Sequence, residues 1–321
     1  MLAVDPFVQD WVAATNGRLY RDLIGKLTSY PVPPWPGPMP RSSGSLVLDI
    51  GCGWGRWMLS SAAAGYVPIG IDVKLEALQA ARRVLKANGR SGFVVAADLK
   101  RLPFKPNTFN MVFSYSVLQH THRLRVTSCI ADVHRVLAAD GACLLQFPLS
   151  HGIGNALRHL PGQPEEDDYE SWCVRYYSMA ELKTLFGRAF HDCQFQTDCY
   201  FGIGVQGSDL GLLPLKYKAI VVMSETLKSL ASVVPPLRRL ADSVYVIARK
   251  DKIASSDCPD GFNVADAGNN LNVLRYLQCP VSGGDLELSP AGNELISKSA
   301  RLAFPVVNEI PVLIADDARS F

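Results

Sequence analysis

A strand that runs directly into a glycine-rich loop is the most informative stretch of the chain. Leu46–Ile50 is apolar except for Asp49, and glycine then stands at every second position from Gly51 to Gly55. A helix is expected from about Arg56. Glycines let the backbone approach a ligand closely, and the start of a helix offers unpaired N–H groups. The segment therefore predicts a ligand-binding turn between a strand and a helix.

Two further carboxylates follow the next two strands. The second strand ends in Gly70-Ile71-Asp72, and the third ends at Asp98. A carboxylate about twenty residues beyond a glycine loop can accept hydrogen bonds from both hydroxyls of a ribose. A single Asp at such a place is usually a helix cap or a loop residue. Acids at the ends of three consecutive strands favour a nucleoside-binding site instead.

Short apolar runs alternate with helical patterns along most of the chain, as βαβ units do. We expect strands near Leu46–Ile50, Val67–Ile71, Phe93–Ala96, Met111–Ser114, Ala142–Phe147 and Val244–Ala248. Helices are expected between Lys74 and Asn88 and between Leu124 and Leu137, with Gly89 suited to ending the first. The predicted fold class is α/β, with a doubly wound, mostly parallel, Rossmann-like sheet.

Two common nucleotide-binding patterns do not fit this loop. A dinucleotide fold needs G-x-G-x-x-G, and Arg56 occupies the third glycine position. The phosphate-loop pattern G-x-x-x-x-G-K-[ST] occurs nowhere in the chain. Asp49, directly before the loop, would repel a phosphate and would favour a ligand that carries a cation.

Several successive segments resemble, as a set, the motifs of the class I S-adenosylmethionine-dependent methyltransferases. They are Asp49–Gly55, Gly70–Asp72, Ala96–Leu99, Leu102–Phe104, Phe109–His120 and His134–Gly141. The resemblance extends from about Leu46 to Lys250. One departure is Ala139-Asp140-Gly141, which stands where a Pro-Gly-Gly turn is usual, and Asp-Gly serves a turn equally well. The resemblance implies an enzyme, a methyltransferase with S-adenosyl-L-methionine as its cofactor.

The resemblance also implies a set of cofactor-binding residues. By this correspondence, the acid and the loop hold the methionine part, Asp72 holds the ribose, and Asp98 with Leu99 holds the adenine. The complete set of expected cofactor residues is Asp49, Gly51, Cys52, Gly53, Gly55, Asp72, Val73, Asp98, Leu99 and Ser114.

The run Ser114–His120 would line the floor beneath the transferred methyl group. Methyl transfer is an in-line displacement that needs positioning and, for a hydroxyl acceptor, a nearby base. His120 is the candidate base because imidazole titrates near neutral pH, although a histidine here can also be purely structural. The expected acceptor-binding residues are Tyr115, Arg175, Tyr176 and Tyr177, for which ordinary packing is the alternative.

The acceptor is expected to be a small molecule, methylated on O, C or N. The Asn/Asp-Pro-Pro-Tyr tetrad of amino-group methyltransferases is absent, with Ser114–Val117 in its place, and no Pro-Cys dipeptide occurs. Lys and Arg number 32 against 30 Asp and Glu, so charge gives no clear signal for nucleic acid. A tRNA- or protein-directed methyltransferase and a catalytically silent scaffold remain alternatives.

Two segments interrupt the regular alternation. His151–Tyr177 carries an acidic cluster at Glu165–Asp168, and Ser178 is expected to cap a helix over Met179–Phe186. The second segment, 196–240, holds a long apolar helical stretch at Leu215–Val234. A substrate lid and an oligomer-forming or core-capping helix are equally good interpretations, so a homo-oligomer is one expectation.

The last fifty residues resemble the short zinc-ribbon-like family that includes the activator of tRNA and release-factor methyltransferases. The match spans Leu271 to Arg319, and of the four thiolates found in zinc-binding members only Cys279 remains. The other positions hold Ser282, Ser297 and Ala300. One thiolate cannot form a closed tetrahedral zinc site, so we expect no metal. Apolar packing of Leu286, Leu295, Phe304, Ile310 and Val312 is expected to hold the module together.

In that family the module binds a methyltransferase and covers apolar surface. Fused within one chain, it is expected to do the same in cis or to mediate self-association, giving a small α+β domain. The predicted domains are 1–45 (helix and Pro-rich linker), 46–250 (methyltransferase, with insertions 151–177 and 196–240), 251–270 (linker) and 271–321.

A cytoplasmic location without membrane association is expected. No apolar run is long enough to span a membrane, and the first ten residues lack the basic and apolar regions of a signal peptide. The eight cysteines include no CxxC pair, which is typical of reduced thiols.

Overall fold

The computed structural model describes residues 3–158, 173–251 and 269–321. The acidic cluster at 165–168 and most of the expected linker 251–270 lie outside these residues.

A seven-stranded sheet with the order β3-β2-β1-β4-β5-β7-β6 forms the centre of the fold. Its strands are β1 (Leu46–Ile50), β2 (Val67–Asp72), β3 (Phe93–Ala96), β4 (Phe109–Ser114), β5 (Leu137–Pro148), β6 (Cys193–Cys199) and β7 (Ser243–Arg249). β1, β2 and β3 pair in parallel, whereas β6 and β7 pair antiparallel. The doubly wound, mostly parallel α/β fold is confirmed. β6 is the one strand of this sheet that the sequence analysis did not expect.

The helices alternate with these strands. The α-helices are α1 (Pro6–Asn16), α2 (Arg56–Ala63), α3 (Leu75–Ala87), α4 (Arg123–Val136), α5 (Ile153–Arg158), α6 (Met179–Phe186) and α7 (Leu215–Val233). Short 3-10 helices are η1 (Arg18–Leu23), η2 (Leu118–His120), η3 (Gly207–Gly211), η4 (Pro235–Leu240), η6 (Asn270–Tyr276) and η7 (Ala315–Asp317).

The chain divides into two compact units, which are described separately. The first unit consists of residues 1–34, 114–126 and 143–249, and the second of residues 35–113, 127–142 and 250–321.

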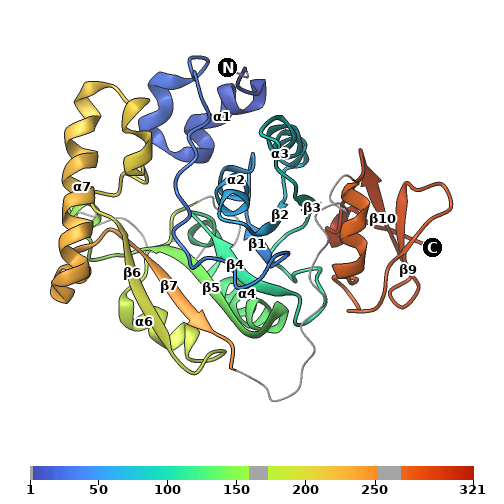
Figure 1. Cartoon of the computed structure of the whole chain (residues 1–321). Helices are drawn as coiled ribbons and strands as arrows, with labels where there is room; N and C mark the ends of the chain where they lie inside the picture. Colours follow the sequence, from blue (N-terminus) through green and yellow to red (C-terminus); the bar gives the residue numbers. More distant parts are fainter. Residues whose placement is uncertain (1–2, 159–172, 252–268) are drawn as a thin grey trace. The chain divides into compact units, whose positions relative to one another are not determined.

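In the second unit, α2 and α3 lie beside the parallel strands β1 to β3 (Figure 1). All five residues of β1 are buried, as expected for a strand covered on both faces. The Pro-rich segment has no helix or strand, as predicted, but it is docked rather than free. Trp35 packs its ring 5.0 Å from Phe113 and 5.7 Å from Tyr66, and the Tyr66 hydroxyl donates to the Pro38 carbonyl.

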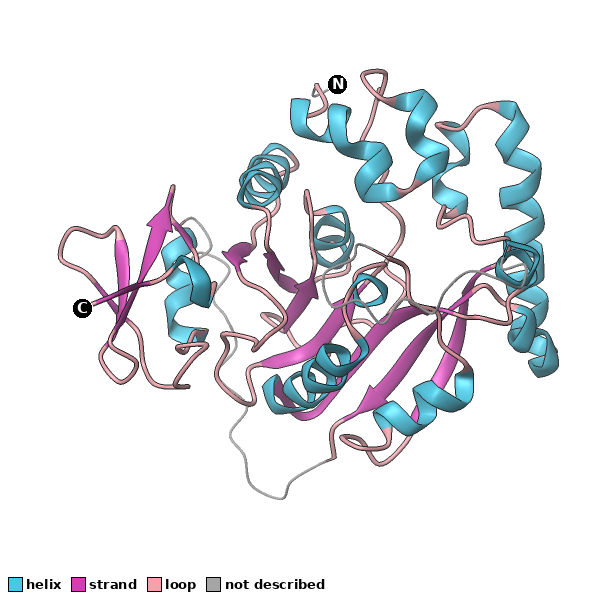
Figure 2. Cartoon of the chain, turned by 180° about the vertical axis from the view of Figure 1, so that it is seen from behind, coloured by secondary structure: helices cyan, strands magenta, loops and turns pink. Residues whose placement is uncertain are grey.

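The C-terminal module forms a small antiparallel sheet beside a helical turn, η6 (Figure 2). Its strands are β8 (Glu287–Leu288), β9 (Glu294–Ser297), β10 (Leu302–Val307), β11 (Ile310–Pro311) and β12 (Arg319–Ser320). Leu295, Phe304 and Ile310 have no exposed surface and Val312 is buried. Leu286 is only half-buried. The apolar core of the module is therefore built largely from the residues that the sequence indicates.

Within the second unit, this module covers the free edge of β3. Val312 forms a parallel bridge with Ala96, and the Leu313 N–H donates to the Ala96 carbonyl over 2.7 Å. Leu277 forms an antiparallel bridge with Phe104. An exposed strand edge is a template for unwanted pairing, so this contact protects the sheet.

Asn270, a residue that is 3% exposed, completes this edge with its side-chain amide. Its Oδ1 accepts from the Val94 N–H over 2.9 Å, and its Nδ2 donates to the Val94 carbonyl over 2.9 Å and to the Glu309 carbonyl over 2.8 Å. One side chain therefore satisfies both polar backbone groups of a residue in β3.

Asn270→Ala should destabilise the protein because it leaves the buried Val94 N–H and C=O without partners. An unsatisfied buried group costs about 1–3 kcal/mol, so we expect a decrease of that order in the free energy of unfolding. Urea unfolding measures it. Asn293→Ala, at an exposed turn of the same module, is the control. Equal unfolding midpoints for the two variants would contradict this role of Asn270.

In the first unit, Ser178 caps α6 as predicted. Its hydroxyl accepts from the Glu181 N–H over 3.1 Å, and the Glu181 carboxylate accepts from the Ser178 N–H over 2.6 Å, which completes a capping box. The long helix α7 packs against β6. Within the described part of the chain, no helix combines the length and the apolarity needed to cross a bilayer.

Candidate cofactor and acceptor sites

The glycine loop folds tightly over the end of β2. Gly51, Gly53 and Gly55 have φ angles of 71°, 51° and 87°, a region that residues with a Cβ rarely adopt. The N–H groups of Gly51 and Cys52 both donate to the Ile71 carbonyl, over 2.8 and 2.9 Å. The loop thus forms a tight turn between β1 and α2, which is the strand–loop–helix order that the sequence predicts.

Gly70 allows this close approach from the side of β2. A Cβ at Gly70 would lie 2.5 Å from the Met58 sulfur and 2.6 Å from the Cys52 sulfur. Such distances are not tolerated, so the glycine of the Gly-Ile-Asp motif is required by packing under the loop.

Asp49 is a buried carboxyl group at the mouth of this loop. It is 2% exposed, and its Oδ2 has no hydrogen-bond partner among the described residues. Burial, and then the charge of Asp72, raise the pKa of Asp49 to about 8. A buried carboxyl without a partner is costly unless a ligand supplies a donor or a cation.

Asp72 lies next to the same loop, at the end of β2. Its Oδ2 accepts from the Gly53 N–H over 3.0 Å, and its Oδ1 accepts from the Lys74 N–H over 2.9 Å. Burial raises the pKa of Asp72, although these backbone donors oppose the shift. The carboxylate therefore holds the loop in place and retains lone pairs for a ligand. Val73, which follows it, is 63% exposed.

The third acid, Asp98, follows β3, and both it and Leu99 are half-buried. The Asp98 Oδ1 accepts from the Lys100 N–H over 2.9 Å. Lys100 reaches the C-terminal module, where its Nζ lies 2.6 Å from a carboxylate oxygen of Asp316. The module thus contacts the loop that carries Asp98.

These features fit S-adenosylmethionine. The methionine part of that molecule carries an ammonium group, which matches the buried, unpartnered Asp49 carboxyl. The glycines, which lack side chains, leave room for the amino-acid end of S-adenosylmethionine. The remaining lone pairs of Asp72 can accept hydrogen bonds from the two hydroxyls of the ribose. The second unit therefore brings together Asp49, the glycine loop and Asp72 as the sequence predicts.

The residues expected beneath the methyl group lie in the first unit. Ser114 ends β4 and is 1% exposed. Ser116 has a φ of 59°, and its N–H donates to Gln146 Oε1 over 3.0 Å. Its hydroxyl accepts from Gln119 Nε2 over 2.9 Å. Polar side chains therefore hold this turn in an unusual backbone conformation, which is common at functional sites.

His120 is half-buried at the end of η2. Its Nδ1 lies 3.3 Å from the Cys173 carbonyl oxygen. Because a carbonyl can only accept, this contact assigns the proton to Nδ1 and makes Nε2 the basic nitrogen. Burial lowers the pKa of His120, the Cys173 carbonyl opposes this shift, and the charge of Arg175 adds to it. The imidazole is thus neutral at physiological pH.

Arg175 lies beside His120, and its backbone N–H donates to the Gln119 carbonyl over 2.8 Å. The Tyr177 ring packs 5.2 Å from Phe147 and beneath the Arg123 guanidinium, at 4.6 Å. The Tyr177 hydroxyl is buried without a partner among the described residues, and burial raises the pKa of Tyr177. Tyr176 is half-buried, and its carbonyl accepts from Arg123 over 2.7 Å.

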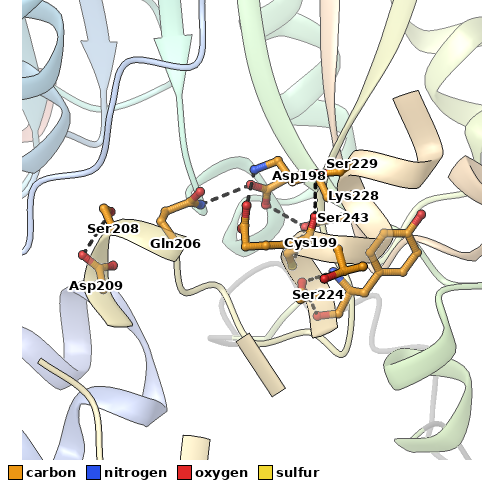
Figure 3. Close-up of polar contacts among 12 residues, drawn as sticks. Asp198, Cys199, Gln206, Ser208, Asp209, Ser224, Lys228, Ser229 and Ser243 are labelled. Carbon is orange, nitrogen blue, oxygen red and sulfur yellow. Dashed lines mark hydrogen bonds and ion pairs between the residues drawn. The ribbon is translucent and has the colours of Figure 1, made fainter. Parts of the chain in front are cut away.

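A buried polar network around Asp198 was not predicted. Figure 3 shows Asp198 between Gln206 and Ser243. The Ser243 hydroxyl donates to its carboxylate over 2.7 Å, and Gln206 and Gln146 each approach it at 3.4 Å. Gln206 also donates to the Tyr115 hydroxyl over 3.3 Å, and that hydroxyl donates to the Gly204 carbonyl over 3.2 Å. Tyr115 is therefore anchored by the network, as Ser116 is through Gln146.

In the C-terminal module, serine hydroxyls stand near the one remaining cysteine. The Ser282 N–H donates to Cys279 Sγ over 3.5 Å, and the Ser282 and Ser299 hydroxyls lie 2.7 Å apart. Ser297 lies 3.4 Å from Ser299. Burial acts to raise the pKa of Cys279, but donors led by Ser282 outweigh it, so the pKa is lowered. Among the described residues, no group of three or more His, Cys, Asp or Glu side chains could hold a metal ion.

Comparison with known families matches both parts of the chain. Residues 47–141 match the model of a methyltransferase domain, and residues 271–309 match that of the Trm112p-like proteins. A UPF0434 protein of Ruegeria pomeroyi is 49% identical over 53 residues, which are 16% of this chain and 86% of that protein. A UPF0434 protein of Nitrobacter winogradskyi is 49% identical over 47 residues, 15% of this chain and 71% of that protein.

Two solved structures illustrate the structural similarity. An S-adenosylmethionine-dependent methyltransferase of Methanosarcina mazei has a TM-score of 0.44 and 17% identity, and covers 66% of this chain and 95% of that chain. The complex of a Trm112 methyltransferase activator and a putative methyltransferase of Haloferax volcanii has a TM-score of 0.45 and 17% identity. It covers 76% of this chain and 92% of the matched chain.

Proposed function

Since the chain is a methyltransferase by its domain at residues 47–141 and belongs to the UPF0434 family through its C-terminal module, we propose that it methylates a small molecule. S-adenosylmethionine is the methyl donor, and the acceptor atom is O, C or N. The observation that carries the proposal is the buried, unpartnered Asp49 carboxyl beside the glycine loop.

On the donor side, Asp49 would hold the ammonium group of the methionine part, beside the backbone of Gly51, Cys52, Gly53 and Gly55. Asp72 and Val73 would bind the ribose, Asp98 and Leu99 the adenine, and Ser114 the reactive end. The cofactor supplies an electrophilic methyl group on a sulfonium. The chain's own residues bind and orient the cofactor. The Asp49 carboxyl is neutral in the empty site and gains a charge partner when the ammonium group binds.

On the acceptor side, His120 would take the proton from the attacking group at Nε2. Its lowered pKa keeps this nitrogen unprotonated at neutral pH, and the Cys173 carbonyl fixes the ring through Nδ1. Tyr115, Arg175, Tyr176 and Tyr177 would bind the acceptor. A hydrogen bond from the Tyr115 hydroxyl to the Gly204 carbonyl supports a fixed position of that side chain, and the Arg175 backbone N–H is held by the Gln119 carbonyl.

The C-terminal module would act in cis. Its contacts to β3 and to Lys100, beside Asp98, support a role in holding the adenine loop. The seven cysteines of the described residues are free thiols, which supports a cytoplasmic location. Homo-oligomer formation through α7 is a further proposal, and exposed apolar residues such as Leu215 and Val233 support it.

A macromolecular acceptor is the second candidate, because the C-terminal module is similar to the Trm112p-like proteins. One experiment separates the two. The protein is incubated with methyl-labelled S-adenosylmethionine and a heat-treated cell extract, in which the extract's own enzymes are inactive. Unreacted donor is removed, and the mixture is divided into small-molecule, RNA and protein fractions. We expect label in the small-molecule fraction, and its loss to background in Asp72→Ala.

Asp285→Ala, an exposed acid of the C-terminal module, is the matched control and should leave the transfer unchanged. Label in the RNA or protein fraction would contradict the small-molecule assignment. Tight binding of S-adenosylhomocysteine without transfer to any fraction would favour a scaffold that retains the fold.

A further inference from the structure

A cavity of about 660 Å³ lies in the second unit between α3 and the C-terminal module. Basic side chains from α3 and the following turn line one wall, namely Arg82, Arg83, Lys86 and Arg90. Asn308 and Glu309 of the module line the other. Pockets of about 300–1,000 Å³ are typical of small-molecule sites.

Basic side chains predominate among the described residues that line this cavity. Arg82 donates to the Asn308 carbonyl and to the carboxylate of Glu309, the acid among the described lining residues. Arg82 is thereby held in position, and Lys86 and Arg90 add two exposed basic side chains to the same lining. Guanidinium groups bind phosphate through paired N–H donors, and a lysine adds a point charge.

The cavity is separate from the cofactor loops. Ser91 and Gly92, which belong to its lining, directly precede the first residue of β3. Asp72 is instead the last residue of β2, and Asp98 follows the last residue of β3 by two positions. In parallel strands these are opposite ends of the sheet. The eleven residue steps along α3 from Leu75 to Lys86 correspond to about 16 Å.

The lining also limits the kind of ligand. None of the described residues that line the cavity is aromatic, and Leu85 is its one large apolar side chain. Single-stranded nucleic acids are bound through aromatic stacking of bases as well as through charge. We propose that this cavity binds a small ligand that carries two or more linked phosphate groups.

Titration calorimetry with sodium tripolyphosphate tests the proposal. At low ionic strength we expect saturable binding that weakens as salt rises, because the contacts are ionic. The double variant Lys86→Glu/Arg90→Glu should weaken binding at least about tenfold, since both charges are reversed. The matched control Lys183→Glu/Arg188→Glu changes the same charge on exposed residues of α6 and the turn after it, and should stay within about twofold.

The affinity for S-adenosylhomocysteine should be the same in all these proteins, which shows that the variants are folded. Should the charge reversal prevent folding, Lys86→Gln/Arg90→Gln should give a smaller loss in the same direction. No binding of tripolyphosphate by the folded wild-type protein, or an equal loss in the control, would overturn the proposal. So would tighter binding of a single-stranded RNA that depends on Lys86 and Arg90, which would assign the site to nucleic acid.

Discussion

Asp49→Asn should weaken the binding of S-adenosylhomocysteine at pH 8 by at least about thirtyfold, because it removes the buried partner of an ammonium group. It should also remove the dependence of that binding on pH. The pKa of Asp49 is raised to about 8, so below this pH the carboxyl is neutral before the ligand binds. The ammonium group favours the ionised form, and binding therefore releases a proton.

The direction of the pH effect follows from this release. Lowering the pH opposes a step that releases a proton, so the wild-type dissociation constant should rise about tenfold per pH unit below about pH 8. At about pH 6, ionising the carboxyl costs about 2.7 kcal/mol. The asparagine variant has no proton to lose, and its affinity should be flat over the same range.

Calorimetry in buffers of different ionisation enthalpy measures both the affinity and the number of protons released. Asp285→Asn, an exposed acid of the C-terminal module, should behave as the wild type. An unchanged affinity in Asp49→Asn would show that this carboxyl does not meet the ligand. A pH dependence that persists in the variant would assign the proton to another group.

The arrangement of the glycine loop and Asp72 could be predicted from the sequence because these parts follow one another along the chain. The glycine loop and Asp72 end adjacent parallel strands, and this order alone places them at one edge of the sheet. The order of strands and loops along the chain was sufficient for this prediction. The same holds for α6, whose capping box is formed by Ser178 and Glu181, only three residues apart.

The network around Asp198 could not be predicted, because its members come from distant parts of the chain. Gln146, Asp198 and Ser243 lie on three strands that only the folded sheet brings together. β6 itself was missed, since Cys193–Cys199 mixes polar and apolar residues and only its last residues are buried. The sequence signal for this network was Gln146, a polar residue in the middle of an otherwise apolar strand.

The C-terminal module shows a similar limit. The sequence places Ser282, Ser297 and Ala300 at the positions of the lost zinc ligands, whereas the hydroxyl beside Ser282 belongs to Ser299. Ser297 is buried and Ser299 is exposed, so the path of the turn decides which hydroxyl meets Ser282, and composition does not encode that path. The docking of Asn270 on β3 likewise joins residues 176 positions apart.

His120→Ala should lower kcat by about 10²–10⁴-fold with an acceptor that must lose a proton, because this is the usual contribution of a general base. The Michaelis constant of the acceptor should change little. The pKa of His120 lies below its ordinary value, so wild-type activity should be constant near neutral pH and fall only on the acid side, as the imidazole gains a proton. The variant should lack this acid limb. Initial rates between about pH 5 and 8 measure both effects.

His134→Ala is the matched control for this experiment. Burial also lowers the pKa of His134, but this histidine lies in α4, outside the proposed acceptor site. The His134→Ala substitution should leave both kcat and the acid limb of the pH profile unchanged. A histidine acts as a general base only where its nitrogen lies within reach of the proton that the acceptor loses. Full turnover in His120→Ala would mean that the acceptor ionises without help, and that the contact between Nδ1 and the Cys173 carbonyl serves only to pack the ring.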